Sequence, residues 1–238
     1  MKAIEQLANL SARNAVVTMR ALQPESRDPA KTADEVRMWL RKIEGLTDLL
    51  GETRERLSLQ GGCWKHLAQV QPSSGEADAA LKTMAECYSR AAAIEEPGDK
   101  CYPLLMACNA QICDAVRTGR DGDDGLVEQL KRLSDLKPPE DADFWQLIQW
   151  ADVRMNLTIL RSPDPSAERP ALEEAYKRAW RHVGSPAKLG SVVEQLDFYE
   201  DIFSSGDPKT ALKRESIIAL AKNLRNTLEV EFPGRQPS

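Results

Sequence analysis

The sequence predicts an all-α protein made of about five antiparallel helical hairpins. Its long apolar segments repeat with the 3.6-residue period of a helix, and clusters of Pro, Gly and Asp separate them. No segment shows the sustained two-residue alternation of a strand. Aromatic residues make up only 5% of the 238 residues, so small and aliphatic side chains must form the core at close helix spacing. We therefore expect an α-solenoid, with an irregular helical bundle as the alternative.

Ten helices are expected in chain order, each ended by a turn cluster. Their predicted ranges are 2–22, 32–50, 53–70, 77–95, 101–118, 125–136, 141–161, 167–183, 186–204 and 208–230. The clearest breaks are QPESRDP (23–29), EEPGD (95–99), TGRDGDDG (118–125), LKPPED (136–141), SPDPSAERP (162–170), GSP (184–186) and SGDP (205–208). Residues 1–231 are expected to form a single helical domain, and residues 232–238 a polar tail.

The segment 55–97 is the most informative part of the chain. One face of its first helix carries Leu57, Gly61, Trp64 and Ala68. One face of its second helix carries Leu81, Met84, Tyr88 and Ala91. Pro97 then ends the pattern. A glycine on an apolar face lets a neighbouring helix approach closely. We therefore expect two helices to meet at Gly61.

Later helices repeat the amphipathic pattern, and each has one face that can be buried. The expected core faces are Phe144, Ile148, Ala151, Met155 and Ile159; Val192, Leu196, Tyr199 and Phe203; and Ile217, Ala221, Leu224 and Leu228.

Charge and hydropathy exclude two classes of protein. The formal net charge is −5 and no run of five Lys or Arg occurs, so binding to nucleic acid is not expected. No segment approaches the roughly 18 apolar residues of a membrane span, and the early charges in MKAIEQLANLSAR do not fit a signal peptide. A cytoplasmic protein without membrane contact is expected.

Five cysteines without a secretion signal indicate reduced thiols. Cys63 and His66 share one helical face, and four residues separate Cys108 from Cys113, with Cys87 and Cys101 between the two groups. Zinc requires about four converging ligands, however, and no Cys-x-x-Cys knuckle is present. The DGDDG segment (121–125) lacks the ligand spacing of a calcium loop. We expect no metal and no cofactor.

No arrangement of nucleophile, base and orienting group supports an enzyme. The chain has two histidines, His66 and His182. Cys63 and His66 are the one potential thiolate pair. We prefer to interpret this pair as a surface histidine beside a buried cysteine. The sequence contains no P-loop, G-x-S-x-G or G-x-G-x-x-G motif.

The hairpin at 55–97 resembles a tetratricopeptide repeat, with its glycine, an aromatic residue three positions later, an aromatic-x-x-Ala second helix and a final proline. The segments EQLANLSAR (5–13), ERLSLQGGCWKHLA (55–68), CYPLLMACNA (101–110) and VVEQLDFYEDIF (192–203) resemble the divergent bacterial repeats called the TPR-sensor type. The family's aromatic residue followed by two basic residues falls on Trp64, Lys65 and His66. Its Tyr-Pro…Asn pattern falls on Tyr102, Pro103 and Asn109, with Met106 and Ala107 as a departure before the asparagine.

Such repeats often accompany a caspase-like CHAT peptidase in bacterial conflict and signalling systems, and they are similar to the regulatory repeats of apoptosis signal-regulating kinases. The resemblance therefore implies a non-catalytic regulatory module that docks a protein partner or a fused or neighbouring effector. The catalytic Cys/His dyad of the peptidase is not visible in this chain.

The resemblance also implies an alternative, a sensor of a nucleotide-like ligand. Its binding residues would be Arg54, Arg56, Trp64, Lys65 and Tyr102, with Asn109 as a further binding residue. Arg and Lys would neutralise phosphate while an aromatic ring stacks on a base. On this hypothesis Arg56 and Lys65 lie on an exposed helix face. The competing interpretation of the same residues places Trp64 in the core and the charges on a solvated face.

Overall fold

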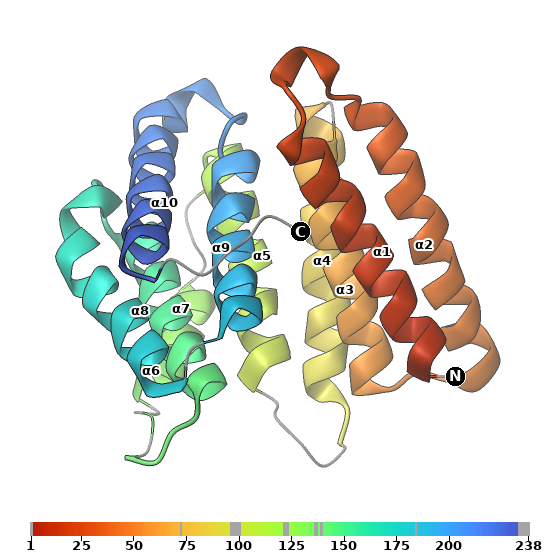
Figure 1. Cartoon of the computed structure of the whole chain (residues 1–238), viewed down its shortest axis with the longest axis horizontal. Coiled ribbons are helices and arrows are strands. Elements are labelled where there is room, and N and C mark those ends of the chain that lie inside the picture. The colour runs from red at the N-terminus through yellow and green to blue at the C-terminus, as the bar shows by residue number, and fades with distance from the viewer. Residues whose placement is uncertain are drawn as a thin grey trace. The chain divides into compact units, whose positions relative to one another are not determined.

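The computed structural model describes residues 2–71, 73–95, 101–120, 124–135, 138, 140–183 and 185–232. In this part of the chain every regular element is a helix, as predicted (Figure 1). The α-helices are α1 (Lys2–Ala21), α2 (Pro29–Leu50), α3 (Arg54–Val70), α4 (Ser74–Ala93), α5 (Cys101–Thr118), α6 (Asp124–Asp135), α7 (Phe144–Arg161), α8 (Arg169–Val183), α9 (Pro186–Ile202) and α10 (Ala211–Glu231). Short 3₁₀ turns are η1 (Pro24–Ser26), η2 (Pro165–Glu168) and η3 (Pro208–Thr210).

Five of the α-helices begin where the sequence supplies a capping side chain. Asp28, Thr53, Ser73, Asp143 and Ser185 each accept a hydrogen bond from a backbone N–H in the first turn of the following helix. These side chains satisfy donors that have no partner inside the helix. Such caps explain why α2 and α4 begin three residues before the ranges expected from apolar periodicity alone.

Some sequence predictions lie outside the described residues. They are Pro97, residues 121–123 of the DGDDG segment, the side chain of His182 and residues 233–238 of the expected tail. Phe232, which was assigned to that tail, packs its ring against Trp180, with 4.7 Å between the ring centroids.

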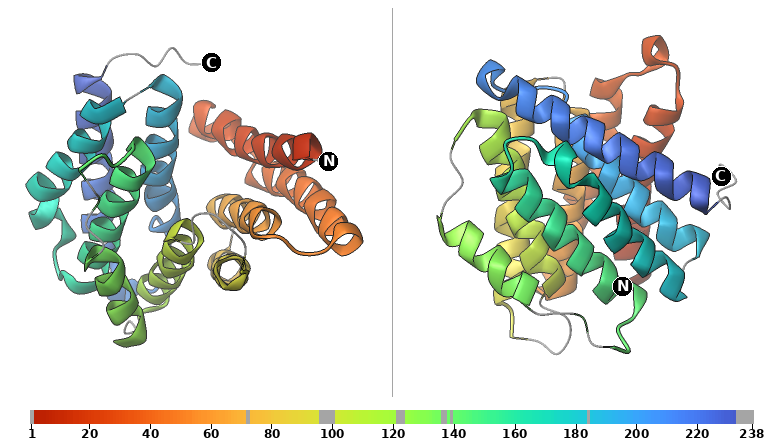
Figure 2. Two further views of the ribbon diagram at one scale, coloured as in Figure 1. Left: turned by 90° about the horizontal axis from the view of Figure 1, so that it is seen from below. Right: turned by 90° about the vertical axis from the view of Figure 1, so that its left-hand side faces the viewer.

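The chain divides into two compact units, Met1–Asp114 and Ala115–Ser238, with the boundary inside α5. The single domain expected over 1–231 stays a prediction, as does the regular solenoid. In the first unit, α1 packs on α2 and α3, α2 packs on α3, and α3 packs on α4 (Figures 1 and 2). Consecutive helices there form the hairpins α1–α2 and α3–α4.

Close packing of α3 on α4 depends on Gly61. A Cβ atom at this position would lie 2.6 Å from Cε2 and 2.7 Å from Cδ2 of Tyr88, which is closer than real contacts allow. Tyr88 is 2% exposed, and its ring meets the ring of Tyr102 edge to face. The expected close approach at Gly61 is confirmed, and so is the burial of Leu81, Met84, Tyr88 and Ala91.

Neighbouring Gly62 brings α1 against the other side of α3. A Cβ atom there would lie 3.2 Å from the Oδ1 atom of Asn9 on α1. The two adjacent glycines therefore let α3 be approached by α4 on one side and by α1 on another.

A buried polar chain joins α2, α3 and α4. Gln60 on α3 donates from Nε2 to Oγ1 of Thr47 at 2.9 Å, and Thr47 donates to the carbonyl of Ile43 at 2.9 Å. The thiol of Cys87 on α4 lies 4.0 Å from Oε1 of Gln60. These contacts supply hydrogen-bond partners to polar groups removed from water.

The second unit is built around α7, α8, α9 and α10. α8 contacts both α7 and α10, α9 contacts α10, and α6 contacts α7 (Figure 2). Three core faces were predicted for this region, and all three are buried as expected. They lie on α7, on α9 with its C-cap residue Phe203, and on α10.

Arg117 anchors the turn that follows α9. Its guanidinium donates to the carbonyls of Ile202 and Ser205, and its own carbonyl accepts from the backbone N–H of Asp207 at 2.6 Å. Gly206 is required at this contact, because its φ is +145° and a Cβ atom would lie 2.8 Å from the Arg117 carbonyl oxygen. Arg117 is 1% exposed, so it serves as a buried cap of the α9 end.

We predict that Gly61→Ala destabilises the protein although alanine favours helices, because its methyl group would collide with the buried ring of Tyr88. Gly61→Leu should cost roughly 1–3 kcal/mol. Gly45 on α2 is the matched control, since a Cβ atom there meets nothing within 4 Å. Gly45→Ala should stabilise by up to about 1 kcal/mol. Urea unfolding of the variants measures both effects, and a stabilising Gly61→Ala would contradict the packing.

We also predict that Arg117→Met lowers the free energy of unfolding by roughly 2–4 kcal/mol, because buried carbonyl groups lose their donors. Arg132→Met on α6 is the control: its side chain is 77% exposed and, among the residues that the structure describes, pairs with Glu128 four residues earlier. That change should stay within about 0.5 kcal/mol. Equal effects of the two substitutions in urea unfolding would show that Arg117 does not hold the turn.

Candidate protein-interaction surface

Helix α1 has two opposite apolar faces. The inner face, which packs against the rest of the first unit, carries Glu5, Ala8, Ala12, Ala15 and Val16, all buried. The outer face carries six exposed residues, which we call the α1 stripe: Ala3, Leu7, Leu10, Asn14, Val17 and Ala21. Leu7 is 56% exposed, Leu10 46% and Val17 37%. No member of the stripe is charged, and this absence is unusual for a solvated helix face.

Helix α2 shows the normal pattern. Its inner face is apolar, whereas its exposed residues include Lys31, Asp34, Glu35, Arg41, Lys42 and Asp48. Since both helices belong to the same unit, the apolar outer face is a property of α1 and not of the whole surface.

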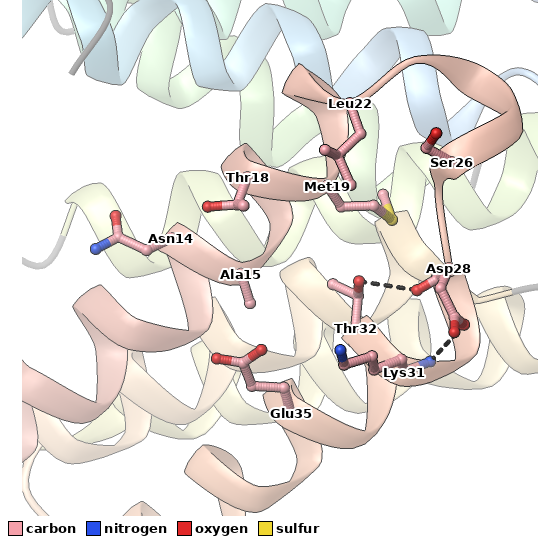
Figure 3. Close-up of a pocket in the computed structure, with 10 residues that line it drawn as sticks. All are labelled: Asn14, Ala15, Thr18, Met19, Leu22, Ser26, Asp28, Lys31, Thr32 and Glu35. Atoms are coloured by element: carbon pink, nitrogen blue, oxygen red, sulfur yellow. Dashed lines mark hydrogen bonds between the residues drawn. The ribbon is translucent and has the colours of Figure 1, made fainter.

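A depression of about 410 Å³ lies between the end of α1 and the start of α2 (Figure 3). Helix α1 lines it with Asn14, Ala15, Thr18 and Met19, and the residues that follow contribute Leu22, Ser26, Asp28, Lys31, Thr32 and Glu35. Asn14 belongs to both the depression and the α1 stripe. The depression therefore continues the stripe toward the C-terminal end of α1.

The charged groups of the depression are partly engaged by the backbone. Asp28 accepts from the backbone N–H of Lys31 at 2.9 Å as the cap of α2, and its carbonyl accepts from the hydroxyl of Thr32 at 2.9 Å (Figure 3). The side chains of Lys31 and Glu35 carry opposite charges one turn apart. Ala15, Met19 and Leu22 are the apolar part of its lining. The other lining residues are polar or charged, with two acidic groups and one basic group, which suits a protein segment better than an anion.

Two of the arginines predicted to bind a ligand instead form contacts inside the first unit. Arg56 donates from Nε to Oε1 of Glu5 at 2.6 Å, and from Nη1 to the carbonyl of Gly51 at 2.9 Å. Its side chain is 15% exposed, so the expectation that Arg56 lies on an exposed face is wrong. Arg54 is 8% exposed and donates from Nη2 to the carbonyl of Ile94 at 2.7 Å.

The other predicted binding residues differ in exposure. Trp64 and Lys65 are half-buried on α3, and Tyr102 at the start of α5 is 43% exposed beside Tyr88. Asn109 is 1% exposed and lies in the core of the first unit. A ligand at the surface can therefore reach Tyr102 but not Asn109.

The four residues on α3 do not form one pocket. Arg54 and Lys65 are eleven residues apart, which is about 16 Å along a helix, and Arg56 and Trp64 are about 12 Å apart along the same axis. Arg56 also points to the opposite side of the helix from Arg54 and Lys65, because each position turns by about 100°. Their role in ligand binding stays a prediction, but the structure does not bring them together.

Cys63 and His66 do not form a reactive ion pair. Burial raises the pKa of the Cys63 thiol to about 12, with the charge of Glu44 and the nearby thiol of Cys87 adding to the effect. Burial lowers the pKa of His66 to about 4, assisted by the positive charges of Lys65 and Arg13. Both groups are therefore neutral at pH 7. Within the described residues, no three His, Cys, Asp or Glu side chains gather as metal ligands would.

Comparison of the chain with protein-family models, with curated proteins and with solved structures finds no match. Among the residues that the structure describes, none of the helices has the length and apolar character needed to cross a membrane.

We predict that Arg56→Ala destabilises the fold by roughly 2–4 kcal/mol, because it leaves the carboxylate of Glu5, whose side chain is 5% exposed, without its cation. Adding Glu5→Gln should recover part of the loss, since the unpaired charge is removed. A double-mutant cycle by urea unfolding measures this coupling, and additive effects of the two substitutions would contradict the buried pair.

Proposed function

We propose that the chain is a non-catalytic protein-interaction module whose docking surface is the α1 stripe together with the adjoining depression. The observation that carries this proposal is the charge-free outer face of α1. Fully burying an aliphatic side chain such as Leu or Val contributes about 1.5–3 kcal/mol, so a helix that covers Leu7, Leu10 and Val17 gains a substantial driving force. Exposed apolar patches of this kind commonly mark protein contacts.

The depression supports the same proposal. Its volume of about 410 Å³ is large enough for a protein side chain, and Met19 and Leu22 provide apolar contact. A partner helix lying along α1 would reach it at the C-terminal end of the stripe. Lys31 and Glu35 at its rim would orient polar groups of the partner.

The resemblance to TPR-sensor repeats suggests the kind of partner. On this proposal the module controls or docks an effector, such as a CHAT peptidase of a bacterial conflict or signalling system, that is fused to it or encoded beside it. The regular solenoid and the cytoplasmic location are part of the same proposal.

The alternative, a nucleotide sensor, has weaker support. Arg54 and Arg56 already donate to a carbonyl and a carboxylate within the unit, and the residues proposed for the pocket are spread along α3. Binding phosphate through Arg56 would require breaking its pair with Glu5.

The test is binding of a CHAT peptidase encoded next to this gene, measured by pull-down and calorimetry. We predict that Leu10→Glu weakens binding at least tenfold, because it places a charge in the centre of the apolar contact. Leu49→Glu is the matched control, since Leu49 is 75% exposed on α2 and lies outside the docking surface. It should leave binding unchanged.

Two results would contradict the proposal. One is effector binding that Leu10→Glu leaves intact. The other is calorimetric binding of ATP, NAD or a cyclic dinucleotide to the wild type that Lys65→Ala abolishes while the circular dichroism spectrum stays unchanged, which would favour the sensor instead.

A further inference from the structure

We propose that the occupant of the α1 stripe is α1 of a second copy of this chain, and that the two helices pack in parallel as a short coiled coil. This inference rests on the proposed function and names the partner of its docking surface. An effector would then bind the dimer through the depression, and Leu10→Glu would weaken its binding by separating the two copies.

The first argument is the spacing of the stripe. Its six residues follow each other at alternating intervals of four and three, so they repeat every 3.5 residues and occupy the two apolar positions of a heptad. Leu7, Asn14 and Ala21 take the first apolar position, called a, and Ala3, Leu10 and Val17 take the other, called d. The buried inner face, with Ala8, Ala12 and Ala15, has the same spacing, so the period permits pairing and the exposure of the stripe distinguishes the two faces.

The structure shows that the heptad faces outward. The positions on the opposite side of the same helix include Ala8, Ala12 and Ala15, which are buried in the first unit. The inner face therefore holds α1 in place while the heptad seam stays exposed. Because α1 is already folded, pairing does not have to supply the free energy of helix formation.

Asn14 argues for a second copy in particular. It is exposed at the middle a position, where an amide facing an unrelated apolar surface would lose its hydrogen bonds to water. An asparagine can both donate to and accept from an identical asparagine across a two-fold axis. A single asparagine at an a position is the device that selects register and number of strands in parallel coiled coils.

Charge selects the parallel direction. The positions beside the seam are Ile4, Ser11 and Thr18 on one side and Gln6, Arg13 and Arg20 on the other. In a parallel pair each side meets the opposite side of the partner, so Arg13 faces the neutral Thr18. In an antiparallel pair like sides meet, which places Arg13 against Arg13 and costs free energy.

The size of the surface indicates a weak dimer. A standard interface uses about 20–30 residues from each partner, whereas the stripe and its flanking positions supply about a dozen. Two leucines and one valine form its apolar part. We therefore expect an equilibrium between monomer and dimer in the micromolar range of concentration.

The test is sedimentation of the purified full chain over about 5 to 500 µM, chosen to span that range. The wild type should pass from monomer to dimer. Leu10→Glu and Asn14→Lys should remain monomeric with an unchanged circular dichroism spectrum, while Leu49→Glu, which is outside the stripe, should dimerise like the wild type. A reversible dimer with this pattern supports the proposal.

Direction is tested by oxidation. In a parallel pair, Val17 meets Val17 of the second copy, so Val17→Cys should form a covalent dimer. Leu49→Cys is the control and should not, although it is more exposed. Most native cysteines do not interfere, because Cys63, Cys87, Cys108 and Cys113 are buried, and Cys101 is checked by oxidising the wild type.

The proposal is overturned by a wild type that stays monomeric over the whole range, by a dimer that survives Leu10→Glu, or by failure of Val17→Cys to cross-link. A Leu10→Glu variant that loses thermal stability instead of association would also overturn it, because the chain itself would then cover the stripe. The proposed function is tested separately from the dimer. It is supported if a monomeric chain binds the effector, and it fails if the chain dimerises but binds no other protein.

Discussion

The structure of the first unit depends on the pair of glycines in the middle of α3. Gly61 admits the ring of Tyr88 from α4, and Gly62 admits the side chain of Asn9 from α1. On the inner face of α1, Ala8, Ala12 and Ala15 are small and buried, and Val16 is buried beside them. Leu7, Leu10 and Val17 lie on the outer face. The packing of the first unit therefore leaves these larger apolar side chains open to a partner.

Three arginines, of which Arg54 and Arg56 were predicted to bind a ligand, serve mainly to hold helix ends. Arg54 binds the carbonyl of Ile94 after α4, Arg56 joins α1 to the turn before α3, and Arg117 caps the end of α9. Carbonyl groups at helix C-termini carry partial negative charge and lack partners within the helix. Buried cations placed there are not available for a phosphate. This is the physical reason for which we favour a protein partner over a nucleotide.

Much of the fold could be predicted from the sequence, because apolar period and turn residues act locally. The faces with Tyr88, Met155 and Leu224 are buried as expected, and Gly61 lies at a close contact. The candidate site could not be predicted. Helix α1 is apolar on both faces, so period alone does not show whether Ala12 or Leu10 points inward. The choice depends on packing against α2 and α3, which are distant in the sequence. Arg56 was expected at the surface because its partner, Glu5, is 51 residues away in the chain.

The central claim is that the outer face of α1 is open in the single chain and covered by another protein surface. The most direct measurement is the rate at which a maleimide labels Leu10→Cys as protein concentration increases. The account predicts labelling close to that of the unfolded chain at low concentration, because Leu10 is 46% exposed, and progressive protection as copies associate. Slow labelling at every concentration would contradict it, since the chain itself would then bury the stripe, and fast labelling at every concentration would show that no second copy covers it.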